Sequence, residues 1–594
     1  MSIIFNLFND TMKKHIDLFC AITALFLSGA CAPTVKAPEA ILPIPEPKQV
    51  EWQKMETYAF VHFGLNTFND REWGYGDSDP KTFNPARLDC EQWVKTFVAS
   101  GMKGVILTAK HHDGFCLWPT KLTEYCIRNT PYKGGKGDIV GELAAACKKY
   151  GIKFAVYLSP WDRHQANYGT PEYVDYFHKQ LRELMTDYGE VFEVWFDGAN
   201  GGDGWYGGAK ENRTIDRKNY YNYPEIYKML SELQPQAIIF SDGGPGCRWV
   251  GNEKGFAGAT NWSFLRTGEV FPGYEKYRTL QYGHADGDQW VAAECDVSIR
   301  PGWFYHAEED SKVKSLKHLA DIYFQSVGYN SVLLLNIPPD RRGLINEADV
   351  QRLNEFAAYR EKIFTNNRVE KGRKDWEAVS GSETVYSLKP ESEINVVMLQ
   401  EDITKGQRVE SFTVEALTEQ GWQEVAKGTT VGYKRMVRFP AVKATQLRVK
   451  INECRLTAHI SQVAAYYADP LEEENRTENW NNLPRASWKQ VAASPLTIDL
   501  GKEVELSAFT YAPLKAEAKP TMAFRYKFYV SADGKNWKEV PANGEFSNIM
   551  HNPLPQTVTF GQKEKARFIK LEATTPTATT AQVEMNEIGV TVAP

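Results

Sequence analysis

Val191-Phe192-Glu193-Val194-Trp195-Phe196-Asp197-Gly198 is an apolar run that ends in an acidic residue and a glycine, and Ala199-Asn200-Gly201 follow it. β-Branched and aromatic residues of this kind favour a buried strand, and the glycines end it. Asp197 therefore stands at the carboxyl end of the strand, where barrels and open α/β sheets place their chemistry. A helix-capping Asp is the alternative, and position alone does not decide between the two.

Size and composition restrict the class of protein. A chain of 594 residues exceeds what one hydrophobic core normally serves, so several domains are expected. The net charge of −6 provides no basic field, which argues against a nucleic-acid partner. Aromatic residues make up 13% of the chain. Surplus Trp and Tyr are typical of carbohydrate sites, because the apolar face of a sugar stacks on an aromatic ring.

The N-terminus carries the pattern of an export signal. Basic residues at Lys13 and Lys14 precede the apolar stretch Leu18–Leu27, and Ser28-Gly29-Ala30-Cys31 come next. This pattern is typical of a secretory signal and is too short for a spanning helix. We interpret residues 1–31 as a lipoprotein signal and 32–49 as a tether, which predicts an exported protein, periplasmic or anchored to the outer membrane of a Gram-negative bacterium. The lipid on Cys31 is then its only expected membrane contact. Plain export with cleavage nearby is the alternative.

The remaining cysteines indicate neither a disulfide framework nor a zinc site. Seven follow Cys31, an odd number, and none forms a C-x-x-C pair. We therefore expect free or buried thiols and no cofactor.

Short apolar strands alternate with amphipathic helices over residues 50–365. Seven strands are expected, at 59–63, 104–108, 154–158, 192–196, 237–241, 290–294 and 332–336. Helices are expected at 90–99, 139–150, 171–188, 223–233, 313–327 and 347–364. Repeats of this kind favour a closed (β/α)8 TIM-like barrel. A doubly wound sheet is the alternative, but no Gly-rich phosphate fingerprint follows the first strand.

The helical period disappears after the barrel, where short alternating segments separated by turns predict two all-β sandwiches, at 366–468 and 469–594. The phrase Tyr529-Val530-Ser531-Ala532-Asp533-Gly534-Lys535-Asn536-Trp537 resembles discoidin-type (F5/8 type C) domains. Such domains either bind glycans or buttress a catalytic neighbour, and both roles stay open.

Polar residues gather where the barrel strands end. Three of the 11 histidines in the chain, His62, His111 and His112, stand at such ends, and so does Tyr157. This arrangement predicts a polar substrate pocket. Glycoside hydrolysis also needs a second carboxyl group. Glu253 is one candidate, but the pattern does not separate it from Asp242, Asp286 or Glu294.

A metal-dependent barrel hydrolase is a competing interpretation, because imidazole and carboxylate are common metal ligands. However, the first strand carries one His rather than a His-x-His pair. Adjacent His111 and His112 would also point in different directions on a regular strand. We therefore expect no metal.

Residues 50–365 resemble the α-L-fucosidases of glycoside hydrolase family 29. The matching motifs are Phe60-Val61-His62-Phe63-Gly64, Glu72-Trp73-Gly74, Ala109-Lys110-His111-His112-Asp113-Gly114-Phe115, Trp195-Phe196-Asp197-Gly198, Gly251-Asn252-Glu253 and Leu334-Leu335-Asn336-Ile337-Pro338-Pro339. The order of barrel and then β-sandwich also matches.

The resemblance implies a retaining exo-glycosidase acting on fucosylated oligosaccharides. It implies that Asp197 is the nucleophile and Glu253 the acid/base, with carboxyl groups about 5–5.5 Å apart. It also implies a set of sugar-binding residues: His62, Glu72, Trp73, His111, His112, Tyr157, Trp195 and Trp303. The Arg248–Glu253 loop resembles the subgroup that prefers α-1,3- and α-1,4-linked fucose. A non-catalytic, glycan-binding surface lipoprotein remains an alternative.

Overall fold

The structure is a computed structural model. It describes residues 43–198, 204–206, 211–370, 375–474, 480–513, 521–540, 544–575 and 579–593, with the backbone alone at 204–206 and 391. The predicted signal, the lipid site at Cys31 and most of the predicted tether lie outside these ranges. None of the helices in them is long and apolar enough to span a bilayer.

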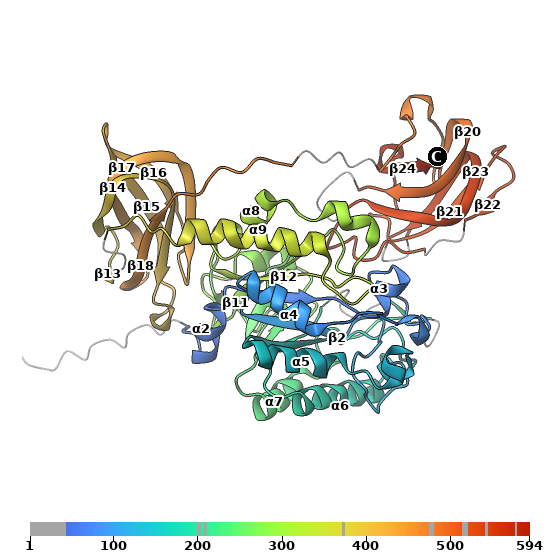
Figure 1. The fold of residues 1–594 in the computed structure, drawn as a ribbon, viewed down its shortest axis with the longest axis horizontal. Helices are drawn as coiled ribbons and strands as arrows, with labels where there is room; N and C mark the ends of the chain where they lie inside the picture. Colours follow the sequence, from blue (N-terminus) through green and yellow to red (C-terminus); the bar gives the residue numbers. More distant parts are fainter. Residues whose placement is uncertain are drawn as a thin grey trace, which may run out of the picture. The chain divides into compact units, whose positions relative to one another are not determined.

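Eight parallel strands close into a barrel, which confirms the predicted fold class (Figure 1). Around the barrel they are β1 (Thr57–Val61), β2 (Gly104–Lys110), β3 (Lys153–Leu158), β4 (Glu193–Trp195), β7 (Ile238–Ser241), β8 (Cys247–Trp249), β11 (Ala292–Ser298) and β12 (Ser331–Asn336). Almost every residue in these strands is buried. This explains their near-continuous apolar sequences, because a parallel sheet is covered on both faces.

One barrel strand was missed by the sequence prediction. The sequence predicts seven strands and a loop at Arg248–Glu253, but Cys247–Trp249 forms β8, paired with β7 and β11. A three-residue strand flanked by glycines has no apolar run to reveal it, so its neighbours specify it. The β7–β8 and β8–β11 connections, both fully described, contain no α-helix. The long β8–β11 connection instead carries the two-stranded sheet of β9 (Phe264–Leu265) and β10 (Gln289–Trp290).

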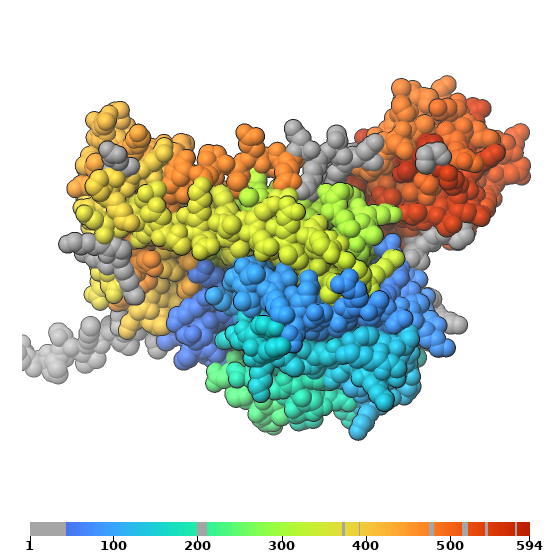
Figure 2. Space-filling model, viewed as in Figure 1, coloured from blue at the N-terminus to red at the C-terminus, as the bar shows by residue number. Residues whose placement is uncertain are grey.

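The predicted helices begin and end close to where the sequence places them. They are α4 (Cys90–Ala99), α5 (Ile139–Tyr150), α6 (Pro171–Asp187), α7 (Tyr223–Leu233), α8 (Leu316–Gln325) and α9 (Glu347–Phe364). The short helices α2 (Pro47–Gln53) and α3 (Leu65–Asn69) were not predicted, and α2 begins inside the predicted tether. Asp89 and Asp138 cap α4 and α5 by accepting backbone N–H groups, which fixes where these helices start. Figure 2 shows the exposed side of α9 in yellow, next to the blue surface of α4.

Two buried carboxyl groups, Glu193 of β4 and Glu294 of β11, lie inside the barrel. The Tyr58 hydroxyl bonds to both Glu193 and Glu294, and the indole N–H of Trp52 donates to Glu193 over 2.9 Å. Burial raises the pKa of Glu193 to about 7 and, together with the charge of Glu193, raises the pKa of Glu294 well above its ordinary value. At a pH between the ordinary pKa of Glu and these raised values, Glu193 and Glu294 are therefore protonated in the folded barrel and ionised in the unfolded chain.

This pair predicts a pH-dependent stability. Between the ordinary pKa of Glu and the raised folded values, the folded state binds more protons, so stability falls as pH rises through that window by up to about 1.4 kcal/mol per pH unit for each proton. Glu294→Gln mimics the protonated acid, and its melting temperature should fall less than that of the wild type between pH 5.5 and 8. Differential scanning fluorimetry at both pH values measures this, and equal losses would contradict it.

Two antiparallel β-units follow the barrel. The first has the order β13-β18-β14-β17-β15-β16. Its strands are β13 (Trp376–Ala378), β14 (Glu383–Glu401), β15 (Val409–Thr418), β16 (Gly421–Gly428), β17 (Arg435–Cys454) and β18 (Ala458–Tyr466). The second has the order β19-β20-β23-β21-β22, with β24 beside β20. Its strands are β19 (Lys489–Ala493), β20 (Leu496–Tyr511), β21 (Arg525–Ser531), β22 (Lys538–Glu539), β23 (Gln556–Thr574) and β24 (Ile588–Val592). The boundaries proposed between these units stay predictions.

Candidate active site

Asp197 follows β4 at the carboxyl end of the barrel. Trp195, two residues earlier, is buried and its indole N–H donates to Glu294 over 2.8 Å. Asp197 lies at the open end instead, with 22% of its side chain exposed. The Tyr157 hydroxyl donates to Asp197 Oδ2 over 2.9 Å. Burial, followed by the charge of Asp197, raises the pKa of Tyr157 well above its usual value, so this donor stays protonated.

His112 is oriented by the end of β3. The Ser159 hydroxyl donates to the Trp161 carbonyl over 2.6 Å, so its oxygen accepts from Nδ1–H of His112 at 2.7 Å. Nε2 is then an acceptor, 3.5 Å from Asp197 Oδ2. Burial lowers the pKa of His112 well below its ordinary value, so the ring is neutral. Each of these two acceptors can accept the O–H of a sugar hydroxyl group.

His62, after β1, is oriented in the same way, and its ring lies 5.3 Å from that of His111. Asn336 Oδ1 lies 2.9 Å from His62 Nδ1, while the Asn336 amide donates to Ser298 and to the Trp303 carbonyl. The oxygen must therefore accept from Nδ1–H, which leaves Nε2 as an acceptor. Burial lowers the pKa of His62 to about 3. Asn336 lies inside a motif that the sequence singled out, but its role was not predicted.

Aromatic rings pack around these groups. His111 stacks on Tyr157 with ring centroids 5.6 Å apart, and Tyr157 stacks on Trp195 at 5.2 Å. Trp73 packs edge-on against His112 at 5.7 Å. The Trp303 ring packs against His62, and its backbone N–H donates to Glu72. Each of the eight residues predicted to bind sugar therefore contacts at least one other member of the set. Trp195 is 5% exposed, and Tyr157 and His112 are still less exposed.

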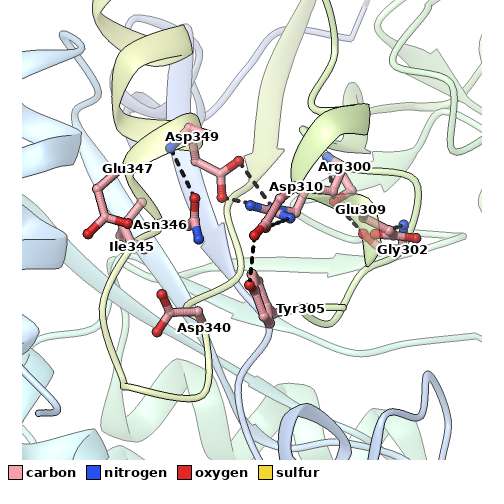
Figure 3. Close-up of polar contacts among 12 residues, drawn as sticks. Arg300, Gly302, Tyr305, Glu309, Asp310, Asp340, Ile345, Asn346, Glu347 and Asp349 are labelled. Carbon is pink, nitrogen blue, oxygen red and sulfur yellow. Dashed lines mark hydrogen bonds and ion pairs between the residues drawn. The ribbon is translucent and has the colours of Figure 1, made fainter. Parts of the chain in front are cut away.

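The loop that carries Trp303 is anchored by charges (Figure 3). The buried Arg300 guanidinium bonds to Asp349 of α9 at 2.9 and 3.1 Å and to Asp310 at 2.8 Å. The Glu72 carboxylate accepts the backbone N–H groups of Trp303 and Phe304. Glu72 therefore positions this loop, which the resemblance alone did not indicate.

Glu253 follows β8 and contacts the loop that carries Trp303. Its Oε2 accepts the Trp303 indole N–H and the Asn548 amide, each over 2.8 Å. Burial raises its pKa to about 8 against the effect of these hydrogen bonds, and the charges of Asp197 and Glu72 raise it further. Glu253 is therefore protonated near neutral pH. Asn548 comes from the C-terminal β-unit, and nothing in the sequence pointed to it.

The other candidate carboxyl groups have different surroundings. Asp286 is 69% exposed and paired with Arg266, and Glu294 is buried under Trp195. Asp242 is buried behind Asp197, where it accepts the Gly273 N–H over 2.7 Å. A Cβ at Gly198 would lie 2.6 Å from Asp242 Oδ2, which explains the glycine after Asp197. Among the contacts described, Glu253 is the one of these four carboxyl groups that accepts a hydrogen bond from the Trp303 indole.

A polar cavity of about 570 Å³ is lined by Asn548, whose amide donates to Glu253. Its walls come from the barrel loops around Arg71 and Gly302 and from residues 545–559 of the C-terminal β-unit. Asn548 and Glu72 line it and also contact the residues of the pocket. The volume falls within the roughly 300–1,000 Å³ range of small-molecule sites.

The described residues also contain donor sets of a kind that metals use. Ligand atoms of His111, His112 and Asp197 all lie within 4.8 Å of one another, and Nδ1 of His111 is buried without a hydrogen-bond partner in the described chain. A neutral His pair with one carboxylate is a chemically acceptable set for a divalent ion. The geometry of these three residues is therefore compatible with the metal-dependent alternative, which an experiment can test.

Comparison with known proteins identifies the family. Residues 43–363 match the model of the family described as Alpha-L-fucosidase, and residues 460–588 match the F5/8 type C domain. Alpha-L-fucosidase 1 of Arabidopsis thaliana is 41% identical over 77% of this chain and 94% of its own. A Bacteroides ovatus protein of known structure is 60% identical, with a TM-score of 0.68 over 94% of this chain and 99% of that chain. A Ruminococcus gnavus glycoside hydrolase family 29 fucosidase, solved in complex with fucose, is 30% identical, with a TM-score of 0.64 over 74% of this chain and 97% of that chain. The chain belongs to the α-L-fucosidases of glycoside hydrolase family 29 and carries an F5/8 type C domain after its barrel.

Proposed function

We propose that this α-L-fucosidase retains the anomeric configuration, with Asp197 as nucleophile and Glu253 as general acid and base. The observation that carries this proposal is the contrast between the two carboxyl groups. Asp197 accepts a hydrogen bond from Tyr157 at the open end of the barrel, whereas burial holds the pKa of Glu253 at about 8. Two carboxyl groups whose surroundings push them toward opposite protonation states suit an acid and a nucleophile.

The first step forms a glycosyl ester. Asp197 attacks the anomeric carbon of fucose while Glu253 gives its proton to the glycosidic oxygen, so the C–O bond breaks and the alcohol leaves. The Asp197 charge disappears in the ester, and the pKa of Glu253 then falls because a neighbouring negative charge is lost. The Glu253 carboxylate takes a proton from water, the oxygen attacks the anomeric carbon, and Asp197 is released as a carboxylate. The acceptor atoms of His62 and His112 suit fucose hydroxyl groups.

The stereochemistry of the first product tests this mechanism. Proton NMR during hydrolysis of an aryl α-L-fucoside should show α-L-fucose first, with the β anomer growing in by mutarotation. Prompt appearance of β-L-fucose would contradict retention.

We also propose that the substrates are branched glycans with α-1,3- or α-1,4-linked fucose. The Arg248–Glu253 loop supports this proposal. So does the polar cavity lined by Asn548, the hydrogen-bond partner of Glu253, because it offers room for a leaving group larger than one sugar. Release of fucose from Lewis-type trisaccharides should exceed release from 2′-fucosyllactose. Fast cleavage of the 2′-linked sugar with Lewis sugars untouched would contradict the linkage.

The set of His111, His112 and Asp197 favours a metal-dependent hydrolase as a second candidate. In our proposal these groups bind sugar and react with it, so extensive dialysis against EDTA should leave kcat/KM within about twofold of the untreated enzyme. A large loss of activity that Zn²⁺, Mn²⁺ or Ca²⁺ restores would favour the metal.

Export as a lipoprotein is a further proposal, supported by the sequence pattern that ends at Cys31. In a Gram-negative host, the full chain should incorporate labelled palmitate and fractionate with membranes. Cys31→Ser should lose both properties and keep its activity. Unlabelled, soluble wild-type protein would indicate plain export.

A further inference from the structure

The C-terminal F5/8 type C domain contacts the barrel at the rim of the active site. Arg163, in the connection between β3 and α6, bonds to both oxygens of Glu545 at 3.1 and 3.2 Å, and both side chains are at least 98% buried. Arg163 also donates to the Gly74 carbonyl, next to Trp73. A buried, bidentate ion pair fixes orientation as well as distance, so the segment after Glu545 is held in register with the pocket.

The segment from Glu545 to Asn552 crosses the rim beside Glu253. Asn552 donates to the Pro301 carbonyl over 2.8 Å, next to the loop that carries Trp303. The His551 ring packs against Trp249 at 5.7 Å, at the end of β8. The segment is therefore attached to the two barrel loops that hold Glu253 and Trp303.

Asn548 lies between these attachments and reaches into the active site. Its side chain is buried, with the whole residue 5% exposed, and its amide donates to Glu253 Oε2. The Trp303 indole donates to the same oxygen. Because two N–H groups occupy Oε2 as an acceptor, the acidic proton of Glu253 is directed to Oε1.

We propose that Asn548 is a positioning residue for the general acid, and that the F5/8 type C domain thereby completes the active site of the barrel. This inference rests on the proposed role of Glu253. As Glu253 gives up its proton, the negative charge develops on a carboxylate that already accepts two N–H groups, and hydrogen bonds to an ionised acceptor are about twice as strong as neutral ones. Asn548 therefore stabilises the ionised form of the acid as it appears in the transition state.

The backbone at Asn548 dictates the best variant. Its φ of 62° lies in the left-handed region, which glycine adopts without strain and alanine does not. Asn548→Gly therefore removes the amide and spares the fold. His551→Leu is the matched control, because it removes an aromatic contact of the same segment with Trp249 of the barrel, and His551 does not line the polar cavity.

The experiment compares both variants with the wild type on two substrates. For Asn548→Gly we expect kcat/KM to fall about 10- to 100-fold on a Lewis-type trisaccharide, whose leaving group needs the acid, and only a few-fold on an aryl fucoside. The basic limb of the kcat/KM profile should move to higher pH, because a donor that favours the ionised carboxylate is gone. Asn548→Asp should move it further, since a second carboxylate opposes ionisation of the first.

Each outcome separates this inference from the proposed function. If Glu253→Ala keeps the wild-type basic limb, Glu253 is not the acid and both proposals are overturned. If Glu253→Ala loses that limb but Asn548→Gly keeps it unshifted, the acid stands and the positioning role is overturned. Equal losses on both substrates, matched by His551→Leu, would mean that Asn548 only docks the domain.

Discussion

Asp197→Ala is expected to lower kcat on an aryl α-L-fucoside by roughly 10⁴- to 10⁶-fold, the range seen when a catalytic nucleophile or its essential partner is removed. The loss follows from geometry. Asp197 lies at the open end of the barrel with 22% of its side chain exposed, and Tyr157 fixes one of its oxygens. Without the carboxylate, the anomeric carbon has no nucleophile on that face.

Azide makes this prediction specific for a nucleophile. In Asp197→Ala the space left by the carboxylate admits azide, which attacks the anomeric carbon directly, so the product should be β-L-fucosyl azide with inverted configuration. In the wild type, a 2-deoxy-2-fluoro-α-L-fucosyl fluoride should leave a covalent adduct on the peptide containing Asp197. Asp242→Asn is the matched control, because this neighbouring carboxyl group bonds to the Gly273 N–H. An adduct on the Asp242 peptide would reassign the nucleophile.

The sequence predicts the scaffold well where local signals are strong. Helices α4 and α5 match the prediction at both ends, because an Asp side chain caps each first turn and an apolar stripe runs behind it. Strand β8 could not be predicted in the same way. Its three residues pair with strands on both sides, and only those neighbours make it a strand.

In the candidate site, too, some residues could be predicted from local sequence signals and others depend on distant contacts. Asp197, His62 and His112 follow strands, so the barrel topology alone brings them to one rim. The groups that orient them are less visible. Ser159 directs a proton on His112 through the Trp161 carbonyl, a contact that depends on the exact bend after β3. Asn548 is 295 residues from Glu253 along the chain and belongs to another domain, so no spacing rule connects them.

Glu253→Ala is the second large effect that we expect. Loss of a general acid costs about 10²- to 10⁴-fold, and the full loss should appear on Lewis-type trisaccharides, whose sugar alcohol leaves poorly without a proton. An aryl fucoside with an acidic phenol should lose much less in kcat/KM, because its leaving group departs as an anion. Steady-state kinetics on both substrates measures the difference. An equal loss on both would assign the acid to another residue.

The pH profile and the azide product identify the role of Glu253. The kcat/KM profile reports groups of the free enzyme, and burial places the pKa of Glu253 at about 8. Activity should therefore fall above that pH in the wild type, and this limb should vanish in Glu253→Ala. Glu253→Gln is the matched control, because its amide oxygen can still accept from Trp303 and Asn548 but cannot transfer a proton. Azide should accelerate Glu253→Ala by attacking the Asp197 ester from the face that water uses, which gives α-L-fucosyl azide with retained configuration. Opposite azide anomers from the two alanine variants would assign nucleophile and acid/base independently, because only attack on a covalent ester preserves the α configuration.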